Sequence, residues 1–287
     1  MNKPKVAYFC MEFGLESDFK IYSGGLGILA GDILKAAKDL DAPMVGVGIL
    51  WRSGLTDQYI DKNGFPYDSY YEYRYDFLKD TGVTVDVKIK DDTVKLKVWK
   101  CDAFGNVPLY LLDSFLPDNP HSLICGNLYG WFEEERIAQE IILGIGGYKA
   151  LKALGEKIDI YHFNDSHPIF CCTEIIKSYM TEQNMTFEQA LEAARKNIVF
   201  TTHTPVPAGN EVHGHKVLEY MGANNGFTKE QMIKIGGDPF NMTVAGLRVS
   251  KIANAVSELH CQTARKMWAD VKDGAQIVNV TNGVHNK

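Results

Sequence analysis

The sequence predicts an α/β fold built on a parallel, Rossmann-like sheet. Short apolar runs alternate with longer segments of helical periodicity, an order typical of parallel sheets with right-handed crossovers. The apolar runs carry no polar face, as expected for strands that helices cover on both sides. Five such strands are expected, at residues 6–10, 45–50, 158–163, 198–202 and 277–280.

Two segments place apolar residues at the spacing of buried helices. The first runs from Ile137 to Leu154 and the second from Val244 to Val256. Residues 84–112 differ, because apolar side chains alternate strictly with polar ones and two turn dipeptides interrupt the run. Such a pattern indicates antiparallel strands with one wet face. We therefore expect one domain over residues 1–287, with an antiparallel insertion near 84–112.

Composition narrows the classes of function. The chain has 287 residues, 45% hydrophobic and 23% charged, which is ordinary for a soluble enzyme. A net charge of −6 predicts no broad basic surface, so no nucleic-acid partner is expected. No apolar run approaches the ~18 residues of a membrane helix, so no membrane partner is expected. The start does not read as a signal peptide, and six scattered cysteines without a C-x-x-C indicate a reduced, cytoplasmic protein.

Each expected strand is followed by a polar segment that contains glycine or histidine. Open α/β sheets bind ligands at the carboxyl ends of their strands, so these segments form the predicted site. In chain order they are MEFGLESDFKIYSGGLG, WRSGLTDQ, NDSHP, HTPVPAGNEVHGH and TNGVH.

The first segment ends in a glycine-rich turn before a helix expected near residues 28–39. It matches neither the dinucleotide-binding fingerprint nor a P-loop. Gly24, Gly25 and Gly27 leave two readings open. The turn either allows close packing of helix on sheet, or brings free backbone N–H groups and the positive helix end to an anion.

Histidines and aromatic residues give weaker signals. His203, His213 and His215 lie close together, but no carboxylate or cysteine completes a clear zinc set, so no metal is expected. The alternating aromatic residues 71–77 are expected to form a strand face rather than a platform for a sugar. Trp51 and Trp131 are better placed for a sugar, because both lie next to the predicted site segments.

Together these segments resemble the α-glucan phosphorylases, a family that includes glycogen, starch and maltodextrin phosphorylase. The match is closest to the shorter bacterial and archaeal forms, and its pieces follow the family's order over nearly the whole chain. The resemblance implies the N-terminal half of a two-domain GT-B fold. It also implies that a terminal glucosyl unit of an α-1,4-glucan is transferred to phosphate, giving glucose 1-phosphate. The pieces are YFCMEFGLESDFKIYSGGLGILAGDILKAAKDL, VGVGILWRSG, RIAQEIILGIGG, NDSHP, FTTHTPVPAGN and TNGVH.

The resemblance also implies roles for particular residues. Gly24, Gly25, Leu26 and Gly27 would form the loop near the phosphate and the glucosyl unit. The backbone carbonyl of His203 would face the glucosyl ring near its anomeric carbon, where positive charge develops.

Glu12, Asp165 and His167 would line the glucan path. The resemblance implies that the family cofactor, pyridoxal 5'-phosphate, is linked to a lysine of a C-terminal domain expected to lie outside this chain. In muscle-type enzymes a tyrosine that touches the cofactor ring occupies the position of Gly14. The chain by itself is therefore expected to release no glucose 1-phosphate.

Two other functions stay open. One is the N-terminal domain of a nucleotide-sugar glycogen or starch synthase, which shares the two-domain architecture and a glycine loop. The other is a stand-alone glucan-binding module, because fold does not dictate activity. A homo-oligomer is also left open by the sequence.

Overall fold

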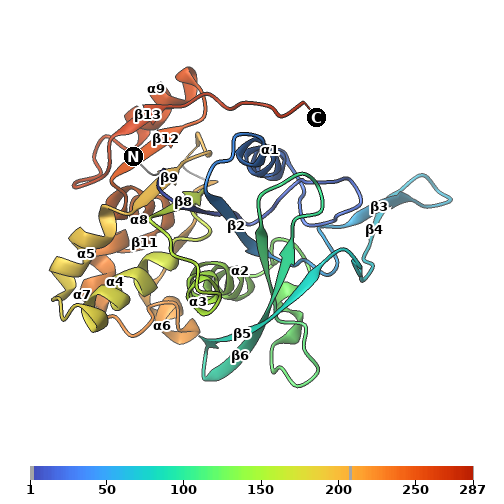
Figure 1. Ribbon diagram of the computed structural model, residues 1–287, viewed down its shortest axis with the longest axis horizontal. Helices are drawn as coiled ribbons and strands as arrows, with labels where there is room; N and C mark the ends of the chain where they lie inside the picture. Colours follow the sequence, from blue (N-terminus) through green and yellow to red (C-terminus); the bar gives the residue numbers. More distant parts are fainter. Residues whose placement is uncertain (1–2, 207–208, 287) are drawn as a thin grey trace.

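A nine-stranded sheet forms the centre of the molecule in the computed structural model, which describes residues 3–206 and 209–286. Seven of these strands run parallel to one another, and the predicted strands are among them (Figure 1). Their spatial order is β13 (Ile277–Asn279), β12 (Ile252–Ala255), β9 (Ile198–Thr201), β8 (Ile160–Asn164), β1 (Val6–Phe9), β2 (Met44–Ile49) and β7 (Leu109–Asp113). The predicted fold class is confirmed.

The antiparallel insertion extends this sheet at one edge. Strands β5 (Lys79–Ile89) and β6 (Asp92–Cys101) form a hairpin, and β6 pairs antiparallel with β7. The hairpin begins at Lys79 rather than near residue 84. Strand β7 also pairs parallel with β2, so it joins the insertion to the parallel sheet.

Helices cover both faces of the sheet (Figure 1). The helical period predicted over residues 137–154 is confirmed, although a π-helical turn, η2 (Ile142–Gly146), interrupts it. The two flanking helices and η2 form one continuous rod on the sheet. The helices are α1 (Gly25–Asp39), η1 (Ser122–Cys125), α2 (Glu133–Ile141), α3 (Gly147–Ala153), α4 (Cys171–Glu182), α5 (Phe187–Arg195), α6 (His215–Met221), α7 (Lys229–Gly236), α8 (Met242–Val249) and α9 (Glu258–Met267).

The helix predicted over residues 244–256 is wrong in its second half. Helix α8 ends at Val249, and Ser250 is extended, with φ −104° and ψ 148°. The chain then enters β12 between β9 and β13. A strand of four residues is too short for the spacing of its apolar residues to separate it from helix, which explains the error.

The aromatic run at residues 71–77 is not a strand, contrary to the prediction. Its rings follow tertiary packing, because Tyr75 and Phe77 lie edge-on against buried Phe19 at centroid distances of 4.7 and 5.0 Å. The chain just before it forms a small hairpin of β3 (Asp57–Ile60) and β4 (Pro66–Ser69), which projects from the body in Figure 1. A second small pair joins β10 (Val212–His213) to β11 (Phe240–Asn241).

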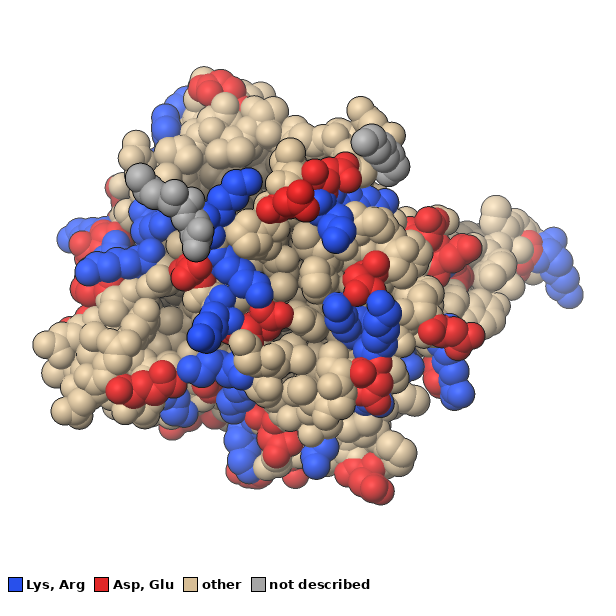
Figure 2. Space-filling view, in the orientation of Figure 1, with Lys and Arg blue, Asp and Glu red and all other residues tan. Residues whose placement is uncertain are grey.

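The surface carries charges of both signs. Figure 2 shows lysine and arginine side chains interspersed with acidic ones on the viewed face. Among the described residues, no helix has the length and apolarity needed to cross a membrane.

Candidate functional site

The polar segments that follow the parallel strands meet at one edge of the sheet. Asn164, at the end of β8, donates from Nδ2 to the sulfur of Cys10 at 3.2 Å. Its Oδ1 accepts from Nε2 of His203 at 2.7 Å, which assigns the proton of that imidazole to Nε2. The Trp51 indole N–H donates to the carbonyl of Met11 at 2.8 Å. Segments after β1, β2, β8 and β9 are thus joined, as the sequence predicts.

The glycine loop presents the bare N-terminus of α1. Gly24 is the N-cap, with extended φ −142° and ψ −161°. Among the described residues no side chain caps this end, and the amides of Gly25, Leu26 and Gly27 have no hydrogen-bond acceptor. The first turn carries no acidic residue. Free N–H groups and the positive end of the helix dipole therefore face the outside of the loop, a geometry that binds anions.

The space available for a side chain differs among the three glycines of the loop. A Cβ on Gly27 would lie 2.6 Å from Cβ of Tyr22 and 2.8 Å from Oε2 of Glu12, so the protein's own packing requires it. A Cβ on Gly24 or Gly25 would meet no described atom within 4 Å, and neither residue has a left-handed φ. Close packing therefore accounts for Gly27, whereas nothing in the described chain requires Gly24 and Gly25.

Glu12 holds the glycine loop in place. Its side chain is buried, and Oε2 accepts from the amides of Ser23 at 2.6 Å and Gly24 at 3.0 Å. Its Oε1 accepts from the hydroxyl of Tyr129 at 2.5 Å. Burial, and then the charge of Glu12, raise the pKa of Tyr129, so its hydroxyl remains a donor. The structure thus places Glu12 beneath the loop with both carboxylate oxygens engaged.

Asp165 and His167 follow β8 directly and lie beside the contacts that Glu12 makes with the glycine loop and Tyr129. Asp165 has a left-handed φ of +68°, a conformation that costs a non-glycine residue energy and recurs at functional sites. His167 is buried, its Nδ1 has no partner among the described residues, and its ring lies 5.7 Å from that of Tyr129. Burial lowers the pKa of His203, so its imidazole is neutral near pH 7.

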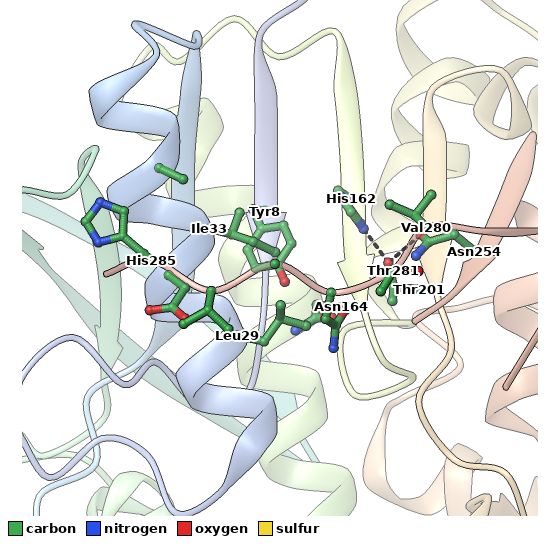
Figure 3. Close-up of a pocket in the computed structure, with 15 residues that line it drawn as sticks. Tyr8, Leu29, Ile33, His162, Asn164, Thr201, Asn254, Val280, Thr281 and His285 are labelled. Atoms are coloured by element: carbon green, nitrogen blue, oxygen red, sulfur yellow. Dashed lines mark hydrogen bonds between the residues drawn. The ribbon is translucent and has the colours of Figure 1, made fainter. Parts of the chain in front are cut away.

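Two cavities adjoin the predicted residues. A polar hollow of about 230 Å³ lies beside the glycine loop, between residues 20–23 and residues 53–57. A second cavity, of about 270 Å³, lies between α1 and residues 280–285 (Figure 3).

The second cavity exposes a row of polar side chains on one face of the sheet. His162 donates from Nε2 to the hydroxyl of Thr201 at 2.7 Å, and that hydroxyl donates to Oδ1 of Asn254 at 2.7 Å (Figure 3). Tyr8 stands edge-on to the His162 ring at 4.9 Å. Sequence reasoning missed this row. Its only signal was polar side chains within apolar strand runs.

Of the two tryptophans expected to contact a sugar, one is placed where it cannot do so. Trp51 is fully buried, and a buried ring cannot stack on a sugar, so that expectation is wrong. Trp131 is 72% exposed next to α2, and its role stays a prediction.

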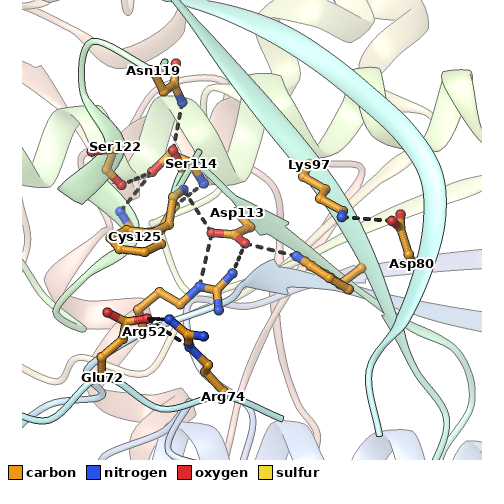
Figure 4. A network of polar contacts seen from close by, with 12 residues as sticks. Arg52, Glu72, Arg74, Asp80, Lys97, Asp113, Ser114, Asn119, Ser122 and Cys125 are labelled. Atoms are coloured by element: carbon orange, nitrogen blue, oxygen red, sulfur yellow. Dashed lines mark hydrogen bonds and ion pairs between the residues drawn. The ribbon is translucent and has the colours of Figure 1, made fainter. Parts of the chain in front are cut away.

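A buried ion pair fixes the edge where β2 and β7 end (Figure 4). Arg52 pairs with Asp113, which has no exposed surface. The Asp113 carboxylate also accepts from the indole N–H of Trp99 and from the amide of Phe115, both at 2.9 Å. Every oxygen of this buried carboxylate is thus satisfied, and the residues following β2 are held in position.

Comparison with known proteins agrees with these features. Residues 137–225 match the family model described as carbohydrate phosphorylase. The chain is 43% identical over 280 residues to an uncharacterized protein of Methanocaldococcus jannaschii, covering 96% of this chain and 52% of that one. It is 38% identical over 309 residues to a maltodextrin phosphorylase of Thermococcus litoralis, covering 100% of this chain and 37% of the relative. A glycogen phosphorylase of Mycobacterium tuberculosis is 38% identical over 315 residues, covering 98% and 36%.

The chain therefore spans about half, or less, of the length of the curated relatives it matches. Within that span the similarity covers nearly every residue of this chain, and the named relatives are a maltodextrin phosphorylase and a glycogen phosphorylase. On these grounds, the chain belongs to the carbohydrate phosphorylase family.

Proposed function

We propose that this chain is the N-terminal, phosphate- and glucosyl-binding part of an α-glucan phosphorylase. The observation that carries the proposal is the uncapped start of α1, with free amides at Gly25, Leu26 and Gly27 and open space around Gly24 and Gly25. The proposed reaction transfers a glucosyl unit from the end of an α-1,4-glucan to phosphate, and the product is glucose 1-phosphate.

In this proposal the glycine loop binds phosphate. The amides of Gly25, Leu26 and Gly27 donate to phosphate oxygens, and the helix dipole adds favourable electrostatics. Glu12 acts as a positioning residue, because its oxygens hold the amides of Ser23 and Gly24 and so fix the shape of the loop. Its negative charge is satisfied by these donors and by Tyr129.

The glucosyl unit is proposed to lie between the loop and the segment after β9. There the backbone carbonyl of His203 faces the anomeric carbon and stabilises the positive charge that develops as the bond to the glucan breaks. The contact of His203 with Asn164 holds this segment. Asp165 and His167 are proposed to contact sugar hydroxyls along the glucan path. The polar hollow beside the loop offers further hydrogen-bonding groups to a sugar.

Gly14 offers no aromatic ring to the family cofactor. A Cβ on Gly14 would lie 2.9 Å from Cδ1 and 3.2 Å from Cα of Ile28, so the helix occupies the space a side chain would need. The position does not fit the ring contact of muscle-type enzymes. We propose that pyridoxal 5'-phosphate and its lysine belong to a C-terminal domain. This chain then contributes binding and orientation.

The proposal extends to organisation and location. Residues 1–287 are taken as one domain that faces the C-terminal domain across the substrate cleft. All six cysteines are free and buried, which supports a cytoplasmic location.

The test is the variant Gly25→Val in the polypeptide that carries these residues together with the C-terminal domain. The added side chain enters the space where phosphate is proposed to bind, and its Cβ meets no described atom within 4 Å. We expect kcat/KM for phosphorolysis of maltodextrin to fall about 10²-fold, as when one preorganised donor is lost. The melting temperature should stay close to that of the wild type.

Gly214→Val is the matched control. Gly214 is the N-cap of α6, and a Cβ there, like one on Gly25, would meet no described atom within 4 Å. This variant should keep both turnover and melting temperature. A folded Gly25→Val enzyme with wild-type turnover would contradict the proposed phosphate site. Glucosyl transfer from a nucleotide sugar, without phosphorolysis, would favour the synthase alternative.

The 287-residue chain supplied alone should bind maltodextrin and release no glucose 1-phosphate, even with added pyridoxal phosphate. Calorimetry and a coupled glucose 1-phosphate assay measure the two properties on one preparation. Phosphorolysis by this chain alone would show that the proposed C-terminal domain is not required.

A further inference from the structure

Three ligand-type side chains from two distant parts of the sequence converge next to α2. They are Glu140 of α2, Glu211, and His213 of β10, and their ligand atoms lie within 4.8 Å of one another. Nε2 of His213 is 3.7 Å from Oε2 of Glu140 and 4.0 Å from Oε2 of Glu211. Both separations are longer than a hydrogen bond, so Nε2 of His213 faces the two carboxylates without bonding to either.

These atoms have no hydrogen-bond partner among the described residues. Glu140 is 0% exposed, and neither of its carboxylate oxygens is bonded. His213 is 4% exposed, and its Nε2 is also without a partner, as is Oε2 of Glu211. An unpaired buried carboxylate is costly, and native proteins seldom leave one unsatisfied. The cluster therefore calls for a positively charged partner.

The surrounding residues aim these atoms at the common point. Nδ1 of His213 bonds to Oε1 of Glu133 at 3.0 Å, so Nδ1 carries the proton and Nε2 presents its lone pair. A carboxylate behind a histidine is the usual outer partner of a metal-binding imidazole. Arg136 pairs with Oε1 of Glu211 and leaves Oε2 free for the cluster. Glu133, Arg136 and Glu140 are spaced i, i+3 and i+7, on one face of α2.

We propose that Glu140, Glu211 and His213 bind one divalent transition-metal ion of the zinc type. One imidazole nitrogen with two carboxylate oxygens is a set that zinc accepts, whereas magnesium and calcium prefer oxygen ligands alone. Tetrahedral bonds of 2.0–2.2 Å place ligand atoms roughly 3.4 Å apart. The observed separations of 3.7 and 4.0 Å need only small side-chain adjustments. Water completes the fourth position.

The ion would connect the segment after β9 to α2. Glu211 and His213 follow the segment that carries His203, and Glu140 lies on the rod that packs against the sheet. The proposal is independent of the proposed function, because it rests on residues outside the glycine loop and on a metal that phosphorolysis does not itself require.

An alternative occupant is a proton. Burial and the charge of Glu211 raise the pKa of Glu140, so a neutral Glu140 could donate to Glu211 in place of an ion. The two arrangements differ in an observable way. Only the metal site makes stability depend on added zinc.

The experiment measures zinc binding to the chelator-stripped chain by calorimetry, with elemental analysis for stoichiometry and thermal melts with and without zinc. We expect one zinc ion per chain and a rise in melting temperature on zinc addition. Glu140→Gln and His213→Gln should each weaken binding by at least 100-fold. Glu133→Gln should weaken it 10–100-fold, as outer partners of metal ligands do.

His215→Gln is the matched control, because His215 bonds to the carbonyl of Gly237 rather than to the cluster. It should retain wild-type affinity. Glu140→Gln keeps the shape of the side chain and removes the buried charge, so it is expected to fold, which circular dichroism checks. Absence of zinc binding by the wild type would overturn the proposal. So would unchanged affinity in folded Glu140→Gln.

Discussion

Replacing Asp113 by alanine is expected to lower the free energy of unfolding by about 3–5 kcal/mol, the usual cost of breaking a buried ion pair. The variant leaves Arg52 without its partner and the indole N–H of Trp99 without an acceptor. Arg52 is only 16% exposed, so water cannot replace the carboxylate freely. Urea unfolding monitored by circular dichroism gives the free energy.

Two control variants test whether the destabilisation comes from leaving a buried charge unpaired. The double variant Arg52→Met with Asp113→Leu should be less destabilised than Asp113→Ala, because no charge is left buried alone. Lys152→Ala removes an exposed ion pair with Glu182 and should leave the melting temperature nearly unchanged. An Asp113→Ala protein as stable as the wild type would show that the pair contributes nothing to folding.

Stability should fall as the pH is lowered from about 6.5 to about 4, and His162 should account for much of the loss. Burial, and then the nearby His203, lower the pKa of His162 to about 4. In this window the unfolded chain takes up a proton that the folded chain excludes, so acid favours unfolding. A shift of this size corresponds to at most about 3 kcal/mol.

His162→Gln removes the titrating group from the same place in β8. Its free energy of unfolding should depend less steeply on pH between 7 and 4.5 than that of the wild type. His121→Gln, which replaces a surface histidine paired with Asp92, should keep the wild-type slope. Parallel slopes for wild type and His162→Gln would rule out His162 as the source of acid sensitivity.

The sequence predicted the parallel sheet because its strands are apolar on both faces, as in β1 and β2. Prediction failed where the spacing of apolar residues along the chain did not match the place of those residues in the fold. The run at Ile252–Ala255 fits a helix by spacing, yet it lies between two strands. The aromatic run ending at Phe77 alternates like a strand, yet its rings pack around Phe19. In both cases distant residues decided the conformation.

The candidate site, too, could be predicted from the sequence only in part. The glycine loop could be located from local spacing, because a helix start is encoded within a few residues. Glu12 could be singled out, but its bonds to Ser23 and Tyr129 could not be foreseen. The cluster at His213 was missed because Glu140 lies far upstream in the sequence. An acidic residue inside an otherwise apolar helix was the available signal.

The π-helical turn η2 gives the rod of α2 and α3 a place where its length can change by one residue. Such a turn holds one residue more than a regular helix would need, and each residue rotates a helix by about 100°. Because the bulge absorbs the extra residue, deleting one residue from Ile142–Gly146 would restore regular helix and leave the face of Glu133, Arg136 and Glu140 toward β10. Deleting one residue from the regular helix α3 would instead rotate that face by about 100°. The turn is therefore a place in this rod where the chain can lose one residue while the face toward β10 keeps its direction.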